Sequence, residues 1–162
     1  MNKSDMKAIF SSNSDEWGTP IDLYRELDAH YNFTLDPCTT PDNPLGTPKF
    51  YTKETNGLRH SWEGERVFMN PPYRTMSDWI TKAMQEKTQL IVMLLPSRTG
   101  TKWFSRLVPW MDQLVFIRGR LRFGVSLNSA PFDSIIVIRG VPDKCIMMKE
   151  RDGAVIWRRD FA

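Results

Sequence analysis

The chain alternates short apolar runs with amphipathic stretches, and this order predicts strands separated by helices. The apolar runs are rich in β-branched and aromatic residues and are too short for buried helices, so we expect strands. The expected strands cover 33–38, 49–52, 67–70, 89–95, 113–117 and 134–138. Apolar residues at i, i+3, i+4 spacing predict helices over about 20–30, 77–86 and 102–110. A closing hairpin is expected within 140–162, with 155–157 as its clearest strand.

This order of elements predicts an α/β sandwich. A strand, a helix and a second strand in succession imply a right-handed parallel crossover, so the sheet should be mostly parallel with a late antiparallel strand pair. With 162 residues, of which 41% are hydrophobic, the chain is long enough for one domain with a substantial core. We expect a single domain over 16–162, preceded by a polar, aperiodic and flexible arm over 1–15.

Composition argues against membrane, secreted and metal-binding classes of protein. The longest apolar run, 90–95, is far shorter than a membrane span, and the first residues contain no apolar signal-peptide region. Cys38 and Cys145 are far apart in sequence, and neither they nor the two histidines show a ligand spacing. We therefore expect reduced thiols, no metal site, no membrane association and a soluble cytoplasmic protein.

The net charge of +3 conceals an uneven distribution. Residues 1–81 contain 8 Lys and Arg against 12 Asp and Glu, whereas residues 82–162 contain 14 against 7, so the halves carry −4 and +7. A positive half with clustered arginines can bind a polyanion, although such clusters are also ordinary solvated surface. The asymmetry favours a nucleic-acid partner without establishing one.

The strand that begins at Val67 ends abruptly in Asn70-Pro71-Pro72-Tyr73. The prolines cannot donate hydrogen bonds to a sheet, so pairing must stop at Asn70, and the rigid backbone holds Tyr73 at a fixed distance beyond it. The Asn side chain offers a carbonyl acceptor and an NH₂ donor. This arrangement suits a planar ring that carries an amino group, whereas the purely structural interpretation is a strand that ends in a Pro-rich turn.

Two further segments end in residues that suit a ligand. Thr19 is a good N-cap and Pro20 a good first residue for the helix over 20–30, and a free helix N-terminus can bind a carboxylate or phosphate. A capped helix without a ligand is the alternative. Asp36 ends the strand before Pro37, where open α/β sheets bind ligands, and a buried acid there needs a donor such as an ammonium or hydroxyl.

Six blocks in this order resemble the small phage-type DNA N6-adenine methyltransferases, the Dam-like family of enzymes that use S-adenosylmethionine. The blocks are Trp17-Gly18-Thr19-Pro20, Leu35-Asp36-Pro37-Cys38, Phe50-Tyr51-Thr52 before Gly57-Leu58, Asn70-Pro71-Pro72-Tyr73, Leu95-Pro96 before Trp103-Phe104, and Gly119-Arg120-Leu121-Arg122-Phe123 before Ala130-Pro131-Phe132. Together they cover about residues 16–139. The resemblance implies a Rossmann-like class I methyltransferase fold and ties the protein to phages and to DNA modification, with a bacterial host cytoplasm as its location.

The resemblance also implies a role for each matching position. Thr19 and Pro20 would receive the cofactor carboxylate. Asp36, with Pro37 and Cys38 beside it, would hold the methionine ammonium, and Phe50 would pack on the cofactor adenine. The sequence departs from the family where a glycine-rich loop is replaced by Cys38-Thr39-Thr40-Pro41, and where an acid before Gly-Leu is replaced by Asn56.

The implied reaction is methyl transfer to the exocyclic N6 of an adenine flipped out of double-stranded DNA at a short specific sequence. Asn70, Pro71, Pro72 and Tyr73 would be the catalytic residues, with the adenine N6–H groups donating to Asn70 Oδ1 and the Pro71 carbonyl. Phe132 is our candidate for the opposite face of the base and Phe123 the second choice, although both also suit a core. The expected DNA contacts are Arg98, Lys102, Arg118, Arg120 and Arg122.

The same Asn-Pro-Pro-Tyr motif also suits other planar amides and amines. A protein-glutamine methyltransferase, an RNA guanine methyltransferase and a cytosine-N4 enzyme therefore remain alternatives. A catalytically inactive DNA-binding module is an alternative from a different class, and the intact Asp36, Asn70 and Tyr73 argue against it.

Overall fold

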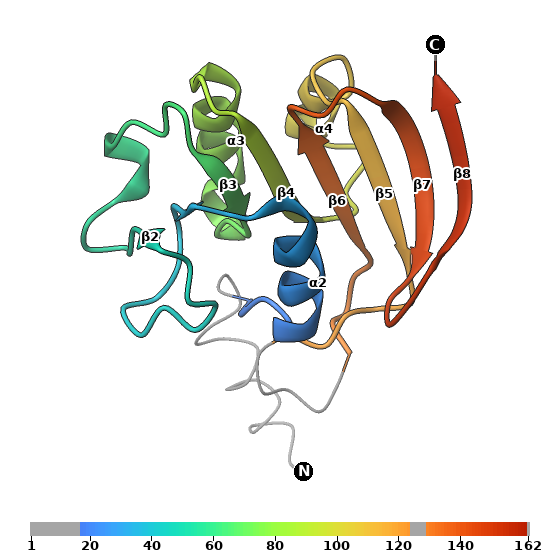
Figure 1. Ribbon diagram of the computed structural model, residues 1–162, viewed down its shortest axis with the longest axis horizontal. Helices are drawn as coiled ribbons and strands as arrows, with labels where there is room; N and C mark the ends of the chain where they lie inside the picture. Colours follow the sequence, from blue (N-terminus) through green and yellow to red (C-terminus); the bar gives the residue numbers. More distant parts are fainter. Residues whose placement is uncertain (1–16, 124–128, 162) are drawn as a thin grey trace.

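The computed structural model describes residues 17–123 and 129–161, so the predicted arm over 1–15 lies outside the described residues. Eight strands of the described chain form one sheet in the order β2-β1-β3-β4-β6-β5-β7-β8 (Figure 1). The strands are β1 (Leu35–Asp36), β2 (Lys49–Phe50), β3 (Arg66–Met69), β4 (Leu90–Pro96), β5 (Gln113–Arg118), β6 (Ser134–Arg139), β7 (Lys144–Glu150) and β8 (Val155–Phe161). The helices are α2 (Ile21–Tyr31), α3 (Met76–Gln85) and α4 (Lys102–Leu107), with 3-10 turns η1 (Gly57–Arg59) and η2 (Tyr73–Thr75).

The sheet is mostly parallel. Strands β1, β2, β3 and β4 pair in parallel, as do β5 and β7, whereas β6 is antiparallel to both β4 and β5 and β8 is antiparallel to β7. The expected mostly parallel sheet and the closing antiparallel hairpin are therefore confirmed. The reversed insertion of β6 between β4 and β5 is an addition that the sequence did not predict, because an apolar run indicates a buried strand but not its direction.

Alternate residues of the central strands point to opposite layers of helices. Met69 and Met93 pack on the face with α3 and α4, whereas Phe68 and Val92 pack on the face with α2, and all four are fully buried. Period-two burial on both faces of the sheet is what a three-layer α/β sandwich requires. Figure 1 shows α2 on one side of the sheet and α3 and α4 on the other.

Three elements are shorter than expected, and prolines explain two of them. The strand predicted over 33–38 pairs only at Leu35 and Asp36, and Pro37, the next residue, has no N–H to continue the ladder. The helix predicted over 102–110 ends at Leu107, because Pro109 cannot donate to the preceding turn. The strand predicted over 49–52 is likewise limited to its first two residues.

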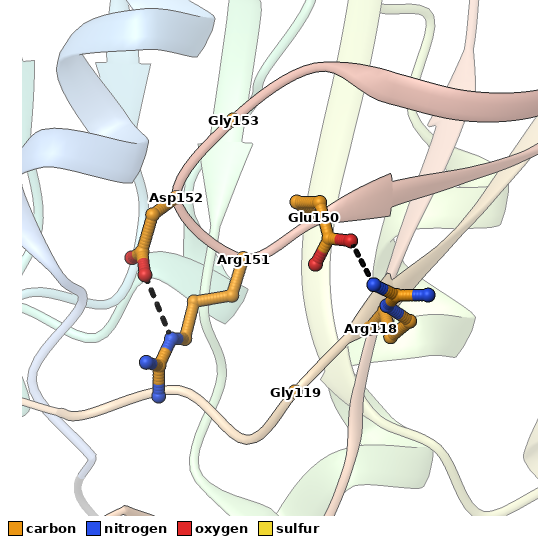
Figure 2. Close-up of a pocket in the computed structure, with 6 residues that line it drawn as sticks. All are labelled: Arg118, Gly119, Glu150, Arg151, Asp152 and Gly153. Carbon is orange, nitrogen blue, oxygen red and sulfur yellow. Dashed lines mark hydrogen bonds and ion pairs between the residues drawn. The ribbon is translucent and has the colours of Figure 1, made fainter.

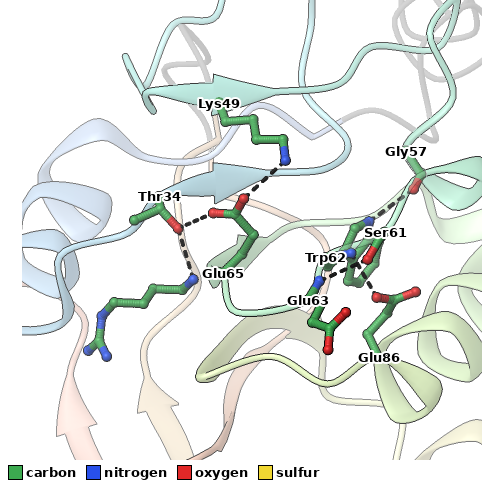
Figure 3. Close-up of polar contacts among 9 residues, drawn as sticks. Thr34, Lys49, Gly57, Ser61, Trp62, Glu63, Glu65 and Glu86 are labelled. Carbon is green, nitrogen blue, oxygen red and sulfur yellow. Dashed lines mark hydrogen bonds and ion pairs between the residues drawn. The ribbon is translucent and has the colours of Figure 1, made fainter.

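A set of polar contacts fixes the starts of the strands and the segment that leads to β3 (Figure 3). Glu65 accepts hydrogen bonds from Thr34 Oγ1 at 2.5 Å and from Lys49 Nζ at 3.0 Å, which joins the residues before β1 and β3 to the first residue of β2. The fully buried Trp62 donates through Nε1 to the Gly57 carbonyl at 2.9 Å and through its backbone N–H to Glu86 at 2.7 Å. These bonds hold Gly57 close to the loop that follows β1.

Gly57 leaves no room for a side chain, because a Cβ built on it would lie 2.0 Å from the Pro37 carbonyl oxygen. We predict that Gly57→Ala lowers the free energy of unfolding by about 1–3 kcal/mol through overpacking, as measured by urea denaturation. Gly100→Ala is the matched control, since a Cβ there meets nothing within 4 Å, and it should change stability by less than about 0.5 kcal/mol. Equal effects of the two substitutions would contradict the packing argument.

Candidate active site

The candidate site lies at the C-terminal ends of β1 and β3, on the side of the sheet where the parallel strands end. Strands β1 and β3 are neighbours, with Leu35 opposite Val67. In this register Cys38 comes level with Asn70, and Asp36 lies two residues, or about 7 Å, deeper along the strands. The predicted acid and the predicted amide are thus brought together on adjacent strands.

The Asn70 side chain is held in one orientation by two acceptors from the segment before α2. Its Nδ2 donates to the Trp17 carbonyl at 2.5 Å and to Thr19 Oγ1 at 3.0 Å. A flipped amide would place Oδ1 against the Trp17 carbonyl, two acceptors facing each other, so the contacts define the orientation. Both N–H groups are used, and no donor among the described residues reaches Oδ1. The half-buried Asn70 therefore presents a free acceptor.

Thr19 does not cap α2, which corrects the prediction from its sequence position. The N-cap is Pro20, whose backbone is extended, and no side chain bonds to the first turn. The Thr19 hydroxyl accepts from Asn70 instead, because the end of β3 lies beside it. The start of the helix is therefore displaced by one residue, and Thr19 contacts the amide of the motif rather than the helix N-terminus. Trp17 accepts from Asn70 through its backbone carbonyl, a contact that no side chain in the sequence could have indicated.

Asp36 is a buried acid without a cationic partner among the described residues. It is 4% exposed, and its Oδ1 accepts a hydrogen bond from the Cys38 backbone N–H at 3.2 Å. Burial raises the pKa of Asp36 to about 7, although the Cys38 N–H opposes this effect. A buried carboxyl with a strongly shifted pKa at a strand end is typical of a ligand site. The chemistry that suits it is a donor with positive charge.

The loop after β1 lines the candidate site next to Asp36. Pro37 is buried against Gly57, and Cys38 is half-buried. Burial and the adjacent Asp36 raise the pKa of the Cys38 thiol well above its usual value, so this cysteine is a neutral thiol and not a reactive thiolate. The Thr39 N–H donates to the Tyr51 carbonyl at 2.9 Å, which ties the loop to the end of β2.

Phe50 lies on the edge strand β2, directly opposite Asp36 in the parallel register. Phe50 is 37% exposed, so part of the residue is accessible to a ligand. The next residue, Tyr51, stacks on His60 with ring centroids 4.2 Å apart and planes at 4°. This stack could not be predicted from the sequence, because no spacing links a tyrosine in one loop to a histidine in the next turn.

Tyr73 and Phe132, which the sequence places 59 positions apart, touch each other in the structure. Their ring centroids lie 5.3 Å apart in an edge-to-face contact, and the Arg98 guanidinium lies 5.8 Å from the centre of the Tyr73 ring. Tyr73 Oη is buried with no hydrogen-bond partner among the described residues, and burial raises its pKa. Phe123 is 4% exposed and packs against Trp17 and Phe132, so it supports Phe132 from the core.

The predicted basic residues reach the same edge of the sheet. Arg98 follows β4, Lys102 begins α4, and Arg118 ends β5. Beyond β5 the chain is not a strand, yet its side chains alternate as expected: Leu121 and Phe123 are buried, and the exposed residues are Arg118, Arg120 and Arg122. Two of these cations are paired with surface acids, Arg118 with Glu150 and Arg120 with Asp133 at 3.9 Å.

Two surface hollows lie beside this basic segment and do not include Asp36 or Asn70. The first, of about 530 Å³, is lined by Arg118, Gly119 and the β7–β8 turn over 150–153 (Figure 2). The second, of about 500 Å³, lies at the start of α2 and shares Arg151 and Asp152 with the first. Arg151 donates to the Arg120 carbonyl at 3.2 Å, so the turn holds the arginine-bearing segment in place.

Within 17–123 and 129–161, no group of three or more His, Cys, Asp or Glu residues is arranged to hold a metal ion. The described residues contain no helix that could span a membrane.

A mostly parallel α/β sheet with an acid and an Asn-Pro-Pro-Tyr motif at the ends of neighbouring strands defines the class as a Rossmann-like methyltransferase fold. The family model for DNA N-6-adenine-methyltransferase (Dam) matches residues 7–139. The chain belongs to this family. The match includes Asp36, Asn70 and Phe132 and ends before the hairpin of β7 and β8.

Two relatives are named DNA N-6-adenine-methyltransferase. The protein of Haemophilus phage HP1 (strain HP1c1) is 32% identical over 122 residues, which are 72% of this chain and 68% of that protein. The protein of Escherichia phage T1 is 32% identical over 152 residues, which are 91% of this chain and 63% of that protein. The chain thus spans about two thirds of the length of each relative.

Two solved structures resemble the chain more distantly. One is a modification subunit assigned to a type I restriction enzyme of Vibrio vulnificus YJ016, at a TM-score of 0.48 and 12% identity, covering 90% of this chain and 49% of that one. The other is a type I restriction-modification methyltransferase subunit of Streptococcus thermophilus, at a TM-score of 0.42 and 12% identity, with 90% and 45% coverage. Both scores lie below 0.5, so the fold is defined by the strand order above.

We predict that Asp36→Asn stabilises the free protein at high pH. The folded-state pKa of about 7 exceeds the ordinary value of 3.8, so ionisation of Asp36 opposes folding. This cost is absent below about pH 4, grows as the pH rises to about 7 and reaches up to about 4 kcal/mol above it. Urea denaturation should show a stability advantage for the variant that is large at pH 8 and small near pH 4.5. An advantage independent of pH would contradict the buried-acid assignment.

Proposed function

We propose that the chain transfers a methyl group from S-adenosylmethionine to the N6 amino group of an adenine in double-stranded DNA, at a short specific sequence. The observation that carries this proposal is the Asn70 amide, whose two N–H groups are bound by Trp17 and Thr19 and whose Oδ1 is free. A fixed acceptor suits an amino group as the target. Family membership supports adenine in DNA as the base that bears it.

The cofactor would bind across the ends of β1, β2 and the start of α2. Asp36 would accept hydrogen bonds from its ammonium, which supplies the positive charge that the buried acid lacks. The carboxylate would meet the first N–H groups of α2 after Pro20, and the exposed face of Phe50 would pack on the adenine. Pro37 and Cys38 would line the site. When bound, the cofactor supplies an electrophilic methyl group on a sulfonium.

Asp36 must be ionised to bind an ammonium effectively. Its pKa of about 7 in the free protein means that about half of the molecules carry the neutral acid at that pH. An ammonium in contact with the carboxylate lowers its pKa, so binding of the cofactor releases a proton. Cofactor affinity should accordingly rise with pH up to about 7.

Asn70 would prepare the target nitrogen for attack. The lone pair of the N6 amino group is delocalised into the adenine ring, which makes the nitrogen a weak nucleophile. Hydrogen bonds from the amino group to Asn70 Oδ1 and to the Pro71 carbonyl favour a more tetrahedral nitrogen, whose lone pair can then point at the methyl group. The nitrogen becomes acidic only as the methyl arrives, so no general base is needed before attack. The bond from the methyl group to sulfur would break as the bond to nitrogen forms, leaving a neutral thioether, and the proton of the alkylated nitrogen would pass to water.

The base would stack on Tyr73 after it leaves the duplex, which partly offsets the few kcal/mol that flipping costs. Phe132 would face the base from the other side, with Phe123 behind it in the core. The ring centroids of Tyr73 and Phe132 lie 5.3 Å apart, so these two rings must separate before a base can enter between them. Arg98, whose guanidinium lies 5.8 Å from the centre of the Tyr73 ring, would contact the phosphate or base next to the flipped nucleotide.

The remaining cations would bind the DNA backbone. Lys102, Arg118, Arg120 and Arg122 are exposed along the edge that carries Asn70. Arg118 would leave Glu150, and Arg120 would leave Asp133, to bind phosphates instead. The two acids would then remain exposed to solvent. Contacts of this kind give affinity and make it decrease with salt, while base contacts from the same segment would select the sequence.

The proposal is tested by incubation with unmethylated DNA and labelled S-adenosylmethionine, followed by nucleoside analysis. N6-methyladenine should be the product, whereas N4-methylcytosine or a labelled protein or RNA would identify one of the alternative enzymes. Asn70→Ala should reduce turnover by at least about 100-fold, as expected for loss of a positioned hydrogen-bonding group, and leave cofactor affinity within a few-fold.

Asp36→Ala is the complementary variant, and its main effect should be a large loss of cofactor affinity measured by calorimetry. Wild-type turnover in Asn70→Ala would refute the assignment of the amide as the acceptor. Failure of the wild-type chain to bind S-adenosylmethionine would instead favour an inactive DNA-binding module.

Thr19→Val tests whether Thr19 positions Asn70 or binds the cofactor. Valine keeps the shape and removes the hydroxyl that accepts from Asn70 Nδ2. Loss of one hydrogen bond of about 1 kcal/mol should lower kcat by about fivefold to tenfold and change the cofactor dissociation constant by less than about threefold. Thr81→Val in α3 is the matched control, because the Thr81 hydroxyl likewise accepts a hydrogen bond, from Arg106 at 3.0 Å, and is not assigned to the site. An effect confined to cofactor affinity would show that Thr19 contacts the cofactor directly.

A further inference from the structure

Strand β8 is the last strand in the sheet order and pairs only with β7. All seven of its residues are exposed, and no residue of the described chain pairs with its outer edge. Figure 1 shows it as the outermost strand at the end of the chain. An unpaired edge of this length offers a row of backbone donors and acceptors to another strand.

The regular part of β8 is the five-residue segment Trp157–Phe161. The register with β7 shifts between Met148 and Lys149, which leaves Ile156 as the extra residue of a bulge. From there on, Trp157, Arg159 and Phe161 point to one face and Arg158 and Asp160 to the other. Arg159 is therefore the centre of the segment.

Trp157 and Phe161 give this face an incompletely covered apolar surface on either side of Arg159. Trp157 is 51% exposed and Phe161 is 47% exposed. Trp157 lies opposite Met148, which lies opposite Phe116, and both of these neighbours are only partly buried. An apolar surface thus runs from the sheet interior to its open edge.

We propose that a second copy of this chain pairs with β8 in the antiparallel direction, about a two-fold axis at Arg159. The pairing places Arg158 of each copy opposite Asp160 of the other, and Trp157 opposite Phe161. Opposite charges and aromatic rings in directly opposed positions stabilise antiparallel strands. The segment is self-complementary in both respects, as a two-fold symmetric interface requires.

The charges of the free chain are already arranged for this exchange. Arg158 Nε lies 2.7 Å from Asp160 Oδ1 along the same strand face, so both groups point to the same side of the edge. Two copies would join these pairs into an alternating set of four charges. The unfavourable element is Arg159, which would lie opposite its own counterpart, although its guanidinium is directed along the strand, 5.8 Å from the centre of the Phe161 ring. The dimer is therefore weak and dependent on concentration.

The proposed interface is separate from the catalytic edge. The hairpin of β7 and β8 lies outside residues 7–139, which match the family model. Substitutions in 158–160 touch none of the residues assigned to the cofactor or the base. Their effect on association should be separable from any effect on the proposed methyl transfer.

Sedimentation velocity over a range of concentrations tests the proposal. The wild-type chain should show a dimer whose fraction rises with concentration. Asp160→Arg puts two arginines opposite each other at each pair, and Arg158→Asp puts two aspartates there, so each variant alone should weaken association at least tenfold. An equimolar mixture of the two variants should restore it, because every Arg then faces an Asp in the mixed dimer.

Arg159→Thr should strengthen association, since it removes the like charges at the axis and introduces a β-branched residue. Thermal unfolding of each variant verifies that it is folded, and restored association in the mixture requires that both are. A wild-type chain that stays monomeric at all concentrations overturns the proposal. So do single variants that dimerise like the wild type, or a mixture that does not associate.

Discussion

The site depends on the two hydrogen bonds that Asn70 Nδ2 donates to the Trp17 carbonyl and the Thr19 hydroxyl. They connect the end of β3 to a segment more than fifty residues earlier, so they fix the start of α2 relative to the strand ends. They also consume every donor of the amide, which determines the side on which its oxygen lies. The same two bonds thereby orient the Asn70 amide and tie the segment before α2 to the end of β3.

The buried layers around the site determine both the cost of ionising Asp36 and the strength of the hydrogen bonds that can form there. Asp36 lies beside strands whose side chains are fully buried on both faces, such as Phe68 and Met69. Removal of water from this edge opposes ionisation of the acid and at the same time strengthens any hydrogen bond made there. Because native stability is a small margin, an ionised Asp36 without a partner uses a large part of it. A bound cation removes that cost.

Much of the fold follows from local sequence patterns. The runs around Val92 and Ile136 are unmistakable strands, and the spacing in α2 and α3 predicts both helices to within one or two residues. Asn70 and Asp36 were recognisable because each ends an apolar run at a proline. The direction of β6 and the bond from Asn70 to Thr19 were not predictable, since pairing and side-chain contacts across 51 residues leave no periodic trace in the chain.

The contact between Tyr73 and Phe132 bears on which adenines can react. In the free protein the two rings touch each other and leave no room for a base. Separating an aromatic pair of this kind costs about 0.5–1.5 kcal/mol beyond the lost burial. A free nucleoside or ATP brings no backbone contacts along an arginine-lined edge with which to offset that cost. A duplex does. In the proposed reaction, the ring pair would therefore disfavour the abundant soluble adenine compounds of a cell and favour bases that arrive as part of a long polyanion.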